Sequence, residues 1–422
     1  MEEIIYNEYV EILKEELLPA MGCTEPIAVA YAAAVAVQAL GEKPESVEVN
    51  VSANIIKNVK SVVVPCTGGL RGIGAAVCAG IVAGCPEKEL EILEEITGEQ
   101  KVEMKKMLDT MPMTIRESDK EYIFDIQIKA CAGGHSGYVE IAGFHTNVIC
   151  VKKDDEIIRE KAYEEQGSSC ATDRSLLTVE KIIEFADCVD VADVEEVLQR
   201  QIDYNWAIAE EGMTGNWGAA IGKTLMEAYG NSVHNRAKAM AAAGSDARMN
   251  GCELPVVINS GSGNQGMTTS LPVIVYAKEL NVSKEMMLRA LVVSNLITIH
   301  MKTGIGRLSA YCGAISAGCG AGAGICYLYG GRAYEISHVI VNAVAINSGV
   351  VCDGAKASCA AKIASAVEAG LLGLQMQKNG KQFYGGDGLV EKGVENTIRN
   401  IGELAKKGMR ETDKTIIQIM TR

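Results

Sequence analysis

Proline and large aromatic residues are scarce in this sequence. It has eight prolines, four phenylalanines and two tryptophans among 422 residues, and beyond Met113 proline occurs only at 255 and 272. Because proline interrupts helices, its absence predicts long helices in the second half of the chain. Helical spacing with glycine or asparagine stops supports this prediction at 176–189, 191–212 and 219–229. Since strands do not alternate with these helices, the pattern argues against a doubly wound α/β fold.

Positive charge is also in short supply. With 40 basic and 54 acidic side chains the net charge is −14, which disfavours nucleic acid and anionic membranes as partners. The first residues have the pattern of an acidic amphipathic helix and not of a secretory signal, so we expect a cytoplasmic protein. In that reducing compartment disulfides are not expected. Most of the fourteen cysteines are then core residues, and a minority remain for metal binding or catalysis.

An apolar run at 308–330 is long enough to cross a bilayer, but its composition favours a buried helix. It is rich in glycine and poor in leucine, and the next run, 333–351, contains Glu335 and His338. Polar side chains of this kind suit a protein interior better than lipid. We therefore expect the run to pack inside a large globular core, with no membrane as partner.

The overall pattern predicts an α+β fold, in which a smaller α/β-sheet domain is inserted beside a large, mainly α-helical domain. Helical spacing at 1–18 and 26–40 predicts N-terminal helices, within residues 1–45, that pack on the catalytic domain. The smaller β-containing domain is expected at 46–165 and the helical cluster-binding domain at 166–422. Strands of the smaller domain are predicted at 46–52, 61–64, 122–130, 138–143 and 147–153, and helices at 75–84, 87–95 and 99–108.

Two residues precede the second predicted helix in a position that can carry chemistry. Pro26 suits the first turn of a helix, which places Cys23 and Thr24 at its N-terminus. Free N–H groups and the helix dipole favour an anion there and lower the pKa of a thiol. Thr24 is thus a candidate for substrate binding and Cys23 for an activated thiol. The alternative is that Thr24 is simply an N-cap and Cys23 a small core residue.

Three predicted turns carry further candidates. The sequence PCTGGLRGIG at 65–74 suits a nest of amides for a carboxylate or phosphate, through Thr67, Gly68 and Gly69, or else a tight strand-to-helix turn. It lacks the lysine and Ser/Thr of a P-loop, so nucleotide binding is poorly supported. His135 and His145 fall in turns between strands, where either binding or a plain surface role is open. Of these turns we single out His145 and Thr146 as substrate-binding candidates.

The segment SGSGNQG at 260–266 has too many small polar residues for a helix interior and lies between apolar runs. A buried loop or broken helix here would offer amides, hydroxyls and the side chains of Asn264 and Gln265. Such groups suit the carboxylate and ammonium of an amino acid. An exposed flexible loop is the alternative.

Five cysteines lie in a glycine- and alanine-rich stretch that has almost no charge between Arg307 and Arg332: Cys312, Cys319, Cys326, Cys352 and Cys359. Thiols in an apolar pocket can hold a soft metal or an iron–sulfur cluster. The spacing is not that of a zinc finger or a ferredoxin, so packing thiols remain an open alternative. The turn at Asp353-Gly354 places Cys359 in the first turns of a helix, where the dipole helps its thiolate.

Four motifs together resemble a known family: Gly22-Cys23-Thr24-Glu25-Pro26, the segment SDARMNGCELPVVINSGSGNQG, Cys312-Gly313, and Cys352-Asp353-Gly354-Ala355-Lys356 with Cys359. Over almost the whole chain they look like L-cysteine desulfidase, a family related to the α chain of iron–sulfur-dependent L-serine dehydratase. The resemblance implies an oxygen-sensitive [4Fe–4S] cluster held by three cysteines, which map onto Cys312, Cys352 and Cys359. It also implies breakdown of L-cysteine to pyruvate, ammonia and sulfide without pyridoxal phosphate.

This resemblance leads to roles for other residues. Cys23 is expected to be the base that removes the Cα proton, or a displaceable fourth cluster ligand. Arg307 and Lys356 are expected to neutralise the substrate carboxylate or the cluster, or to be structural salt-bridge partners. Cys319 and Cys326 are treated as packing residues.

One departure from the family pattern leaves the substrate open. The serine dehydratases have a histidine in the turn where this chain has Cys23, so L-serine dehydration is the alternative reaction. A non-catalytic cluster protein that senses amino acids, and a metal-free structural or binding protein, are the other classes. The large helical surface favours a homodimer.

Overall fold

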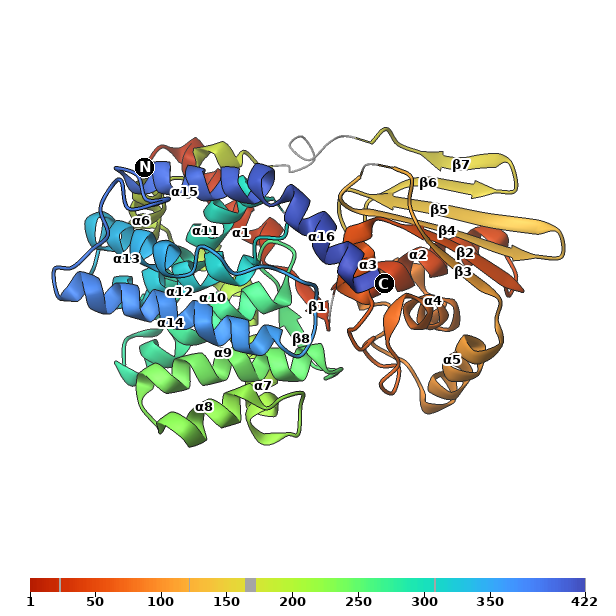
Figure 1. The fold of residues 1–422 in the computed structure, drawn as a ribbon, viewed down its shortest axis with the longest axis horizontal. Helices are drawn as coiled ribbons and strands as arrows, with labels where there is room; N and C mark the ends of the chain where they lie inside the picture. Colours follow the sequence, from red (N-terminus) through yellow and green to blue (C-terminus); the bar gives the residue numbers. More distant parts are fainter. Residues whose placement is uncertain (23, 121, 164–171, 307–308, 422) are drawn as a thin grey trace.

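The computed structural model describes residues 1–22, 24–120, 122–163, 172–306 and 309–421. Figure 1 shows two lobes: a helical lobe on the left, and on the right a twisted sheet covered by helices. The predicted α+β fold, with a large helical part and a smaller sheet-containing part, is confirmed. The polar motifs of the sequence meet where the two lobes touch.

The helical lobe is built around one glycine-rich helix, α12, which spans Gly313–Leu328. An added Cβ at Gly322 would lie 2.9 Å from the carbonyl oxygen of Gly370, and one at Gly324 would lie 2.8 Å from that of Ala290. The small side chains therefore let two neighbouring helices approach α12 at backbone distance, which explains why its cysteines and glycines are buried. The helices of this lobe are α1 (Glu3–Glu16), α6 (Val179–Cys188), α7 (Glu195–Thr214), α8 (Ile221–Tyr229), α9 (Val233–Met249), α10 (Gly263–Glu279), α11 (Lys284–Ile305), α12, α13 (Ala333–Ile346), α14 (Cys359–Lys378) and α15 (Val394–Glu403).

The sheet of the second lobe has six strands in the order β3-β2-β4-β5-β6-β7, and all neighbours are antiparallel except β2 and β3. Helix α2 crosses this sheet so closely that an added Cβ at Gly137 of β5 would lie 2.5 Å from the backbone nitrogen of Leu40. The strands are β2 (Ser46–Val51), β3 (Met113–Glu117), β4 (Asp125–Ala132), β5 (His135–Ala142), β6 (Val148–Lys153) and β7 (Glu156–Glu160), and the helices α2 (Thr24–Leu40), α3 (Ala53–Val59), α4 (Gly72–Ala83) and α5 (Gly98–Thr110).

Two features connect the lobes. Strands β1 (Pro19–Met21) and β8 (Pro255–Val257) form a two-stranded antiparallel sheet just before α2 leaves the helical lobe. The last helix, α16 (Arg410–Thr421), follows a π-helical turn at Leu404–Gly408 and reaches across to α3, as Figure 1 shows. The first and last parts of the chain thus both pass between the lobes.

The predicted segments 1–45, 46–165 and 166–422 stay a prediction as domains. Within the first segment, α1 packs in the core of the helical lobe, where Tyr9 contacts Phe185 with ring centroids 5.3 Å apart. Helix α2 instead belongs to the core beneath the sheet. The alanine and valine side chains of α2 allow it to be covered by the sheet on one side and by α4 on the other.

Some predicted elements differ from the structure. Residues 61–64 form no strand, and only Val63 makes an isolated bridge, to Arg71, because the chain turns there to bring the next motif toward the helical lobe. The helix predicted at 87–95 is a short 3-10 helix, Pro86–Glu91. The exposed strands β3 and β7 were not predicted; β7 (EIIRE) lacks alternation between apolar and polar residues, and β3 (MTIRE) alternates over only four residues.

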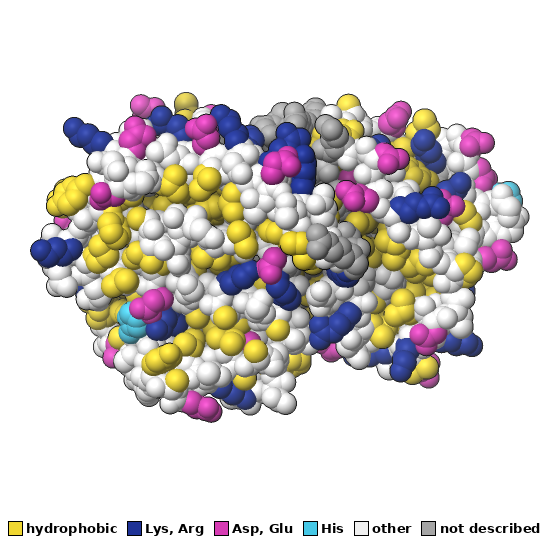
Figure 2. All heavy atoms as spheres, viewed as in Figure 1, with side chains coloured by type: hydrophobic (Ala, Val, Ile, Leu, Met, Phe, Trp, Pro, Cys, Tyr) yellow, Lys and Arg dark blue, Asp and Glu magenta, His cyan; other side chains and the backbone are white. Residues whose placement is uncertain are grey.

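The apolar stretch that includes residues 313–328 forms a buried helix, as predicted. In the described part of the chain, no helix is both long and apolar enough to cross a membrane. Figure 2 shows hydrophobic side chains on the visible face of the helical lobe, where Figure 1 places α13 and α14. Tyr334 of α13 is 69% exposed and Leu372 of α14 is 44% exposed. The predicted homodimer stays a prediction.

A buried carboxylate holds the N-terminus of α8. Asp246 of α9 is fully buried and accepts a hydrogen bond from the backbone nitrogen of Gly222, at 3.2 Å. Its other oxygen has no hydrogen-bond partner among the described residues. Burial therefore outweighs these favourable contacts and raises the pKa of Asp246 to about 6, since burial penalises the charged form.

Replacing Asp246 by asparagine is expected to stabilise the protein more at pH 7.5 than at pH 4.5. The folded-state pKa lies above the unfolded value, so ionisation of Asp246 lowers the stability of the wild type as pH rises through 4 to 6; the gain for the variant is at most about 3 kcal/mol. Urea-unfolding midpoints at the two pH values measure this.

A matched control is the exposed cap Asp173, whose pKa is lowered by hydrogen bonds from Ser175. Asp173→Asn should lose stability at pH 7.5, the opposite sign. Equal effects of Asp246→Asn at both pH values would contradict the prediction.

Candidate functional site

Two segments of the cysteine stretch are held side by side by backbone hydrogen bonds. The nitrogen of Cys352 donates to the carbonyl oxygen of Ala310 at 2.6 Å, and that of Cys312 donates to Val350 at 3.2 Å. Cys312 stands directly before α12 as its N-cap residue, and not within that helix as the sequence spacing suggested. The two cysteines, forty residues apart in sequence, are therefore brought to the same end of the helical lobe.

The third cysteine begins the next helix. Cys359 is the first residue of α14, as predicted, and its sulfur lies 3.6 Å from the carbonyl oxygen of Gly354. The loop before it is closed by Asp353, which pairs with both Lys356 (2.6 Å) and Lys362. Although burial opposes it, hydrogen bonds from these two lysines lower the pKa of Asp353. Lys356 also donates to the carbonyl oxygens of Asp353 and Gly354, so it stabilises this loop.

Burial dominates the electrostatics of two of these cysteines. Burial, and then the neighbouring Cys352 and Cys359, raise the pKa of Cys312 to about 12. Burial likewise raises the pKa of Cys359, with Cys352 adding to the rise. A thiophilic metal removes the protons of such buried thiols on binding.

This donor set fits an iron–sulfur cluster better than a single metal ion. Three sulfurs with two lysines nearby suit an anionic cluster, which spaces its ligands more widely than one ion does. In the parts of the chain described, no group of three or more His, Cys, Asp or Glu side chains is close enough to hold one ion. Cys319 and Cys326 are buried along α12.

The start of α10 lies against these cysteines. Gln265 is in its first turn, and its amide carbon would be 2.7 Å from a Cβ added at Gly313, the neighbour of Cys312. Asn264 contacts the sulfur of Met249 at 3.6 Å, and Met249 belongs to the small apolar cluster against which Cys359 packs. Asn264 and Gln265 are therefore helical residues and not part of a loop, because the helix begins at Gly263, immediately after the turn.

The side-chain oxygens of Asn264 and Gln265 are buried and have no hydrogen-bond partner among the described residues. Gln265 as a whole is only 6% exposed. A buried polar atom without a partner is costly, and most such atoms in folded proteins are satisfied. Both oxygens are thus available to a ligand that donates hydrogen bonds.

The N-terminus of α2 reaches the same place from the second lobe. The Thr24 hydroxyl donates to the carbonyl oxygen of Gly261 at 3.2 Å, and Gly22 accepts a hydrogen bond from Arg248 at 2.8 Å. Cys23 lies outside the described residues, as does Arg307. Glu25, the next residue of α2, accepts hydrogen bonds from Thr24 and Asn58, both at 3.1 Å.

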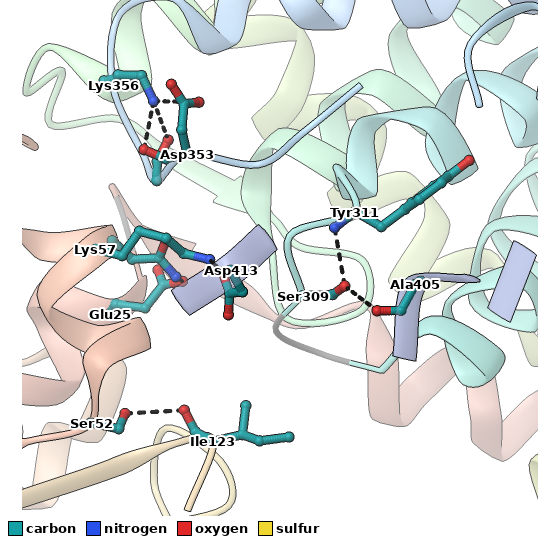
Figure 3. Close-up of polar contacts among 12 residues, drawn as sticks. Glu25, Ser52, Lys57, Ile123, Ser309, Tyr311, Asp353, Lys356, Ala405 and Asp413 are labelled. Carbon is teal, nitrogen blue, oxygen red and sulfur yellow. Dashed lines mark hydrogen bonds and ion pairs between the residues drawn. The ribbon is translucent and has the colours of Figure 1, made fainter. Parts of the chain in front are cut away.

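Helices α3 and α16 lie beside the cysteine loop and complete the surroundings of the site. Figure 3 shows Lys57 of α3 facing Asp413 of α16, near Glu25, while Asp353 and Lys356 occupy the loop opposite. The ion pair between Lys57 and Asp413 is 2.5 Å long, and the Lys57 side chain is almost fully buried. The backbone of Lys57 touches Gly354 so closely that an added Cβ at Gly354 would overlap it.

Three other predicted residues form a turn near Gly22. Thr67 is buried, and its hydroxyl donates to Val64 (2.7 Å) and accepts from Leu70 (3.2 Å), so it closes the turn itself. Gly68 and Gly69 have positive φ angles and open space around them. The preceding Pro65 contacts Gly22, since a Cβ at Gly22 would lie 3.1 Å from its Cβ. The turn is adjacent to the α2 motif, and its predicted substrate contacts stay predictions.

The two histidines named from the sequence lie in different parts of the structure. His145 packs edge-to-face on Phe124, with ring centroids 4.9 Å apart, and its Cε1 is 3.7 Å from a Cβ added at Gly261. It therefore lies at the turn before α10, with Thr146 next to it. His135 is exposed and pairs with Asp154 at 3.1 Å at the far end of β5, so the structure does not bring it to the site.

A buried amide network sets the position of the turn before α10. Asn295 of α11 accepts hydrogen bonds from Gln201 (3.0 Å) and Asn259 (2.9 Å), and donates to Gln201 at 2.8 Å. All three side chains are fully buried. The network fixes Asn259, and with it the left-handed residue Ser260, φ 51°, immediately before the start of α10.

Sequence reasoning missed Glu25, Lys57, Asn58, Arg248 and Asp413 as residues of this region. Glu25 and Arg248 were inside the motifs that carry the resemblance, which is a signal that was available. No such signal exists for Lys57, Asn58 and Asp413, because only the fold brings α3 and α16 beside the cysteine loop.

Replacing Gly354 by alanine is expected to lower the free energy of unfolding by about 2 kcal/mol or more. Its φ of 91° is unfavourable for alanine, and the new methyl group would overlap the backbone of Lys57. Gly349→Ala is the matched control, since nothing lies within 4 Å of a Cβ there. Urea unfolding of both variants tests this, and similar losses for the two would refute it.

Comparison with known proteins agrees with this arrangement. The model of a family described as serine dehydratase alpha chain matches residues 87–418. A UPF0597 protein of Desulfitobacterium hafniense is 60% identical over 415 residues, which cover 98% of this chain and 96% of the relative. UPF0597 proteins of Lachnoclostridium phytofermentans (50% identical; 99% and 100% covered) and Treponema denticola (44%; 98% and 98%) are also similar. The predicted relation is confirmed: this chain belongs to the serine dehydratase alpha chain family.

Proposed function

We propose that this protein is an L-cysteine desulfidase, which converts L-cysteine to pyruvate, ammonia and hydrogen sulfide with a [4Fe–4S] cluster and without pyridoxal phosphate. The observation that carries the proposal is the placement of the three cysteines at one end of the helical lobe. Backbone hydrogen bonds pair the segments of Cys312 and Cys352, and the loop after Cys352 leads to Cys359 at the start of α14. This end of the lobe lies at a junction lined by polar motifs from both lobes. Family membership supports lyase chemistry of the serine dehydratase type.

The three cysteines would hold the cluster through their sulfurs. When bound by only three protein ligands, such a cluster supplies an open iron that acts as a Lewis acid toward the substrate. Lys356 and Lys362 would offset part of the negative charge, since both lower the pKa of Cys359 against the effect of burial. Asp353 keeps these two lysines in place.

The side chains around the cysteines would bind and orient the amino acid. The partnerless oxygens of Asn264 and Gln265 are acceptors for the substrate ammonium group. The turn that carries His145 and Thr146 closes one side, and the Thr67–Gly69 turn lies beyond Gly22. Gln265 and Thr67 are buried, and the exclusion of water around such groups strengthens the polar contacts they make.

Cys23 is proposed as the base. It immediately precedes α2, whose N-terminal dipole favours a thiolate. The thiolate would take the Cα proton, the Cα electrons would form the Cα–Cβ double bond, and the Cβ–S bond would break with its electron pair leaving on sulfur. The resulting aminoacrylate tautomerises and hydrolyses to pyruvate and ammonia.

L-serine dehydration is the second candidate, and the description of the family favours it. The same proton abstraction would then expel hydroxide from Cβ. Cysteine is ranked first because the four motifs together resemble L-cysteine desulfidase, and Cys23 in place of the histidine of the serine dehydratases keeps serine as the alternative.

Anaerobic reconstitution with iron and sulfide is the decisive experiment. We expect a brown protein that forms sulfide and pyruvate in equal amounts from L-cysteine, with a lower kcat/KM for pyruvate formation from L-serine. Cys312→Ala, Cys352→Ala and Cys359→Ala should each lose the visible absorbance and the activity.

Cys319→Ala is the control, because Cys319 is buried in α12, 1% exposed, and assigned to packing; it should keep both properties. A coloured protein that consumes neither amino acid would support a non-catalytic cluster protein instead. A colourless wild type would remove the basis of the proposal.

Cys23→Ser tests the base separately. Serine is nearly isosteric but far less acidic, so the variant should retain the visible absorbance and lose at least about a hundredfold in kcat. Wild-type turnover in this variant would eliminate Cys23 as the base, and loss of colour would assign it as a cluster ligand.

A further inference from the structure

One buried guanidinium at the site has no counter-ion. Arg248, near the C-terminal end of α9, is 2% exposed. Its Nε donates to the carbonyl oxygen of Gly22 at 2.8 Å. Its side chain makes no salt bridge with any carboxylate in the described part of the chain, in contrast to Arg174, Arg236, Arg289 and Arg332.

This arrangement is costly unless an anion joins it. Arginine remains charged and offers five N–H donors, of which the described residues engage one. A buried charge without a partner loses its hydration and gains little in return. Gly22 supplies only a neutral carbonyl, so both terminal nitrogens remain for a planar anion such as a carboxylate.

The surroundings favour an anion at the same point. Arg248 packs directly on the start of α10, because a Cβ added at Gly263 would lie 2.5 Å from Nε and 2.8 Å from Cζ. The N-cap Ser262 makes no side-chain hydrogen bond to this helix of 17 residues. Free backbone N–H groups and the positive end of the helix dipole therefore add to the charge of the guanidinium.

Hydrogen-bond acceptors lie one helical turn away from these donors. The Gln265 and Asn264 side-chain oxygens are buried acceptors with no partner among the described residues, and Gln265 lies against Gly313, next to Cys312. Donors on the Arg248 side and acceptors on the Gln265 side match the carboxylate and ammonium of a zwitterion. Cys312 directly precedes Gly313, and Cys359 packs with Met249. The two cysteines would then lie toward the side chain of such a ligand.

We propose that Arg248 binds the α-carboxylate of the amino-acid substrate and makes the site selective for free α-amino acids over the corresponding amines, amides and esters. The inference rests on the proposed function and deepens it. It also orients the substrate: the carboxylate is held between α9 and α10, the ammonium group at Asn264 and Gln265, and the β-substituent is directed toward the cysteines.

The test measures binding of L-alanine, which has no leaving group, and of L-alaninamide, which lacks the carboxylate. Calorimetry with the full-length reconstituted protein should show L-alanine binding at least tenfold tighter than the amide. Arg248→Met should weaken L-alanine about thirtyfold or more and bring the two ligands to similar affinity. Arg248→Lys, which keeps the charge but not the planar fork, should lie between.

Arg200→Met is the matched control. Arg200 also donates to a backbone carbonyl, that of Leu17 at 3.3 Å, and is not among the residues assigned to the site. It should leave the preference for L-alanine unchanged, at equal visible absorbance. Arg248 variants that keep the preference would overturn the proposal, as would a wild type that does not distinguish the two ligands.

The failure of the proposed function has a different signature. A wild type that prefers L-alanine through Arg248 yet forms no sulfide or pyruvate from L-cysteine or L-serine would uphold the binding role and reject the lyase activity. Active Arg248 variants with an unchanged KM for L-cysteine would uphold the lyase activity and reject the binding role of Arg248. In active enzyme the change from arginine to lysine should raise KM more than it lowers kcat.

Discussion

The arrangement of the site depends on the short pairing between the segment before α12 and the segment before α14. Two backbone hydrogen bonds, from Cys312 to Val350 and from Cys352 to Ala310, bring together parts of the chain that helices α12 and α13 separate in sequence. Backbone hydrogen bonds do not depend on side-chain identity, so the cysteine side chains take no part in this pairing and can bind a ligand. The glycines of α12 have a matching role, since they let α11 and α14 approach closely enough for the two segments to meet.

The second lobe supplies what the helical lobe lacks. The end of α3 contacts Gly354 in the cysteine loop, and the start of α2 and the His145 turn contact Gly261 just before α10. The turn at 65–69 contacts Gly22, so each of these contacts is made with a glycine. Sites at the junction of two lobes commonly collect polar groups in this way, because neither lobe must bury them within its own core.

The sequence predicted most of the helices that it singled out and four of the strands, β2, β4, β5 and β6, because their apolar spacing is strong. It also predicted Cys359 in the first turns of a helix and a buried position for the segment of Asn264 and Gln265, since motif composition and turn signals survive without tertiary information. It failed at 61–64, where a β-branched run turns instead of pairing, and at the start of α10, where small polar residues enter a helix. It had no means of finding Lys57 or Asp413, because their proximity is produced only by the packing of the two lobes.

The contact between Lys57 and Asp413 joins residues 356 positions apart. During synthesis, α3 leaves the ribosome long before α16 exists. Lys57 therefore cannot pair with Asp413 until the last helix of the chain has been made. Contacts of such long range are slow to form, and the lobes of larger proteins tend to fold as units first. The part of the structure beside the cysteine loop is consequently among the last to close, which leaves an interval after the helices have assembled in which this loop is still open to solvent.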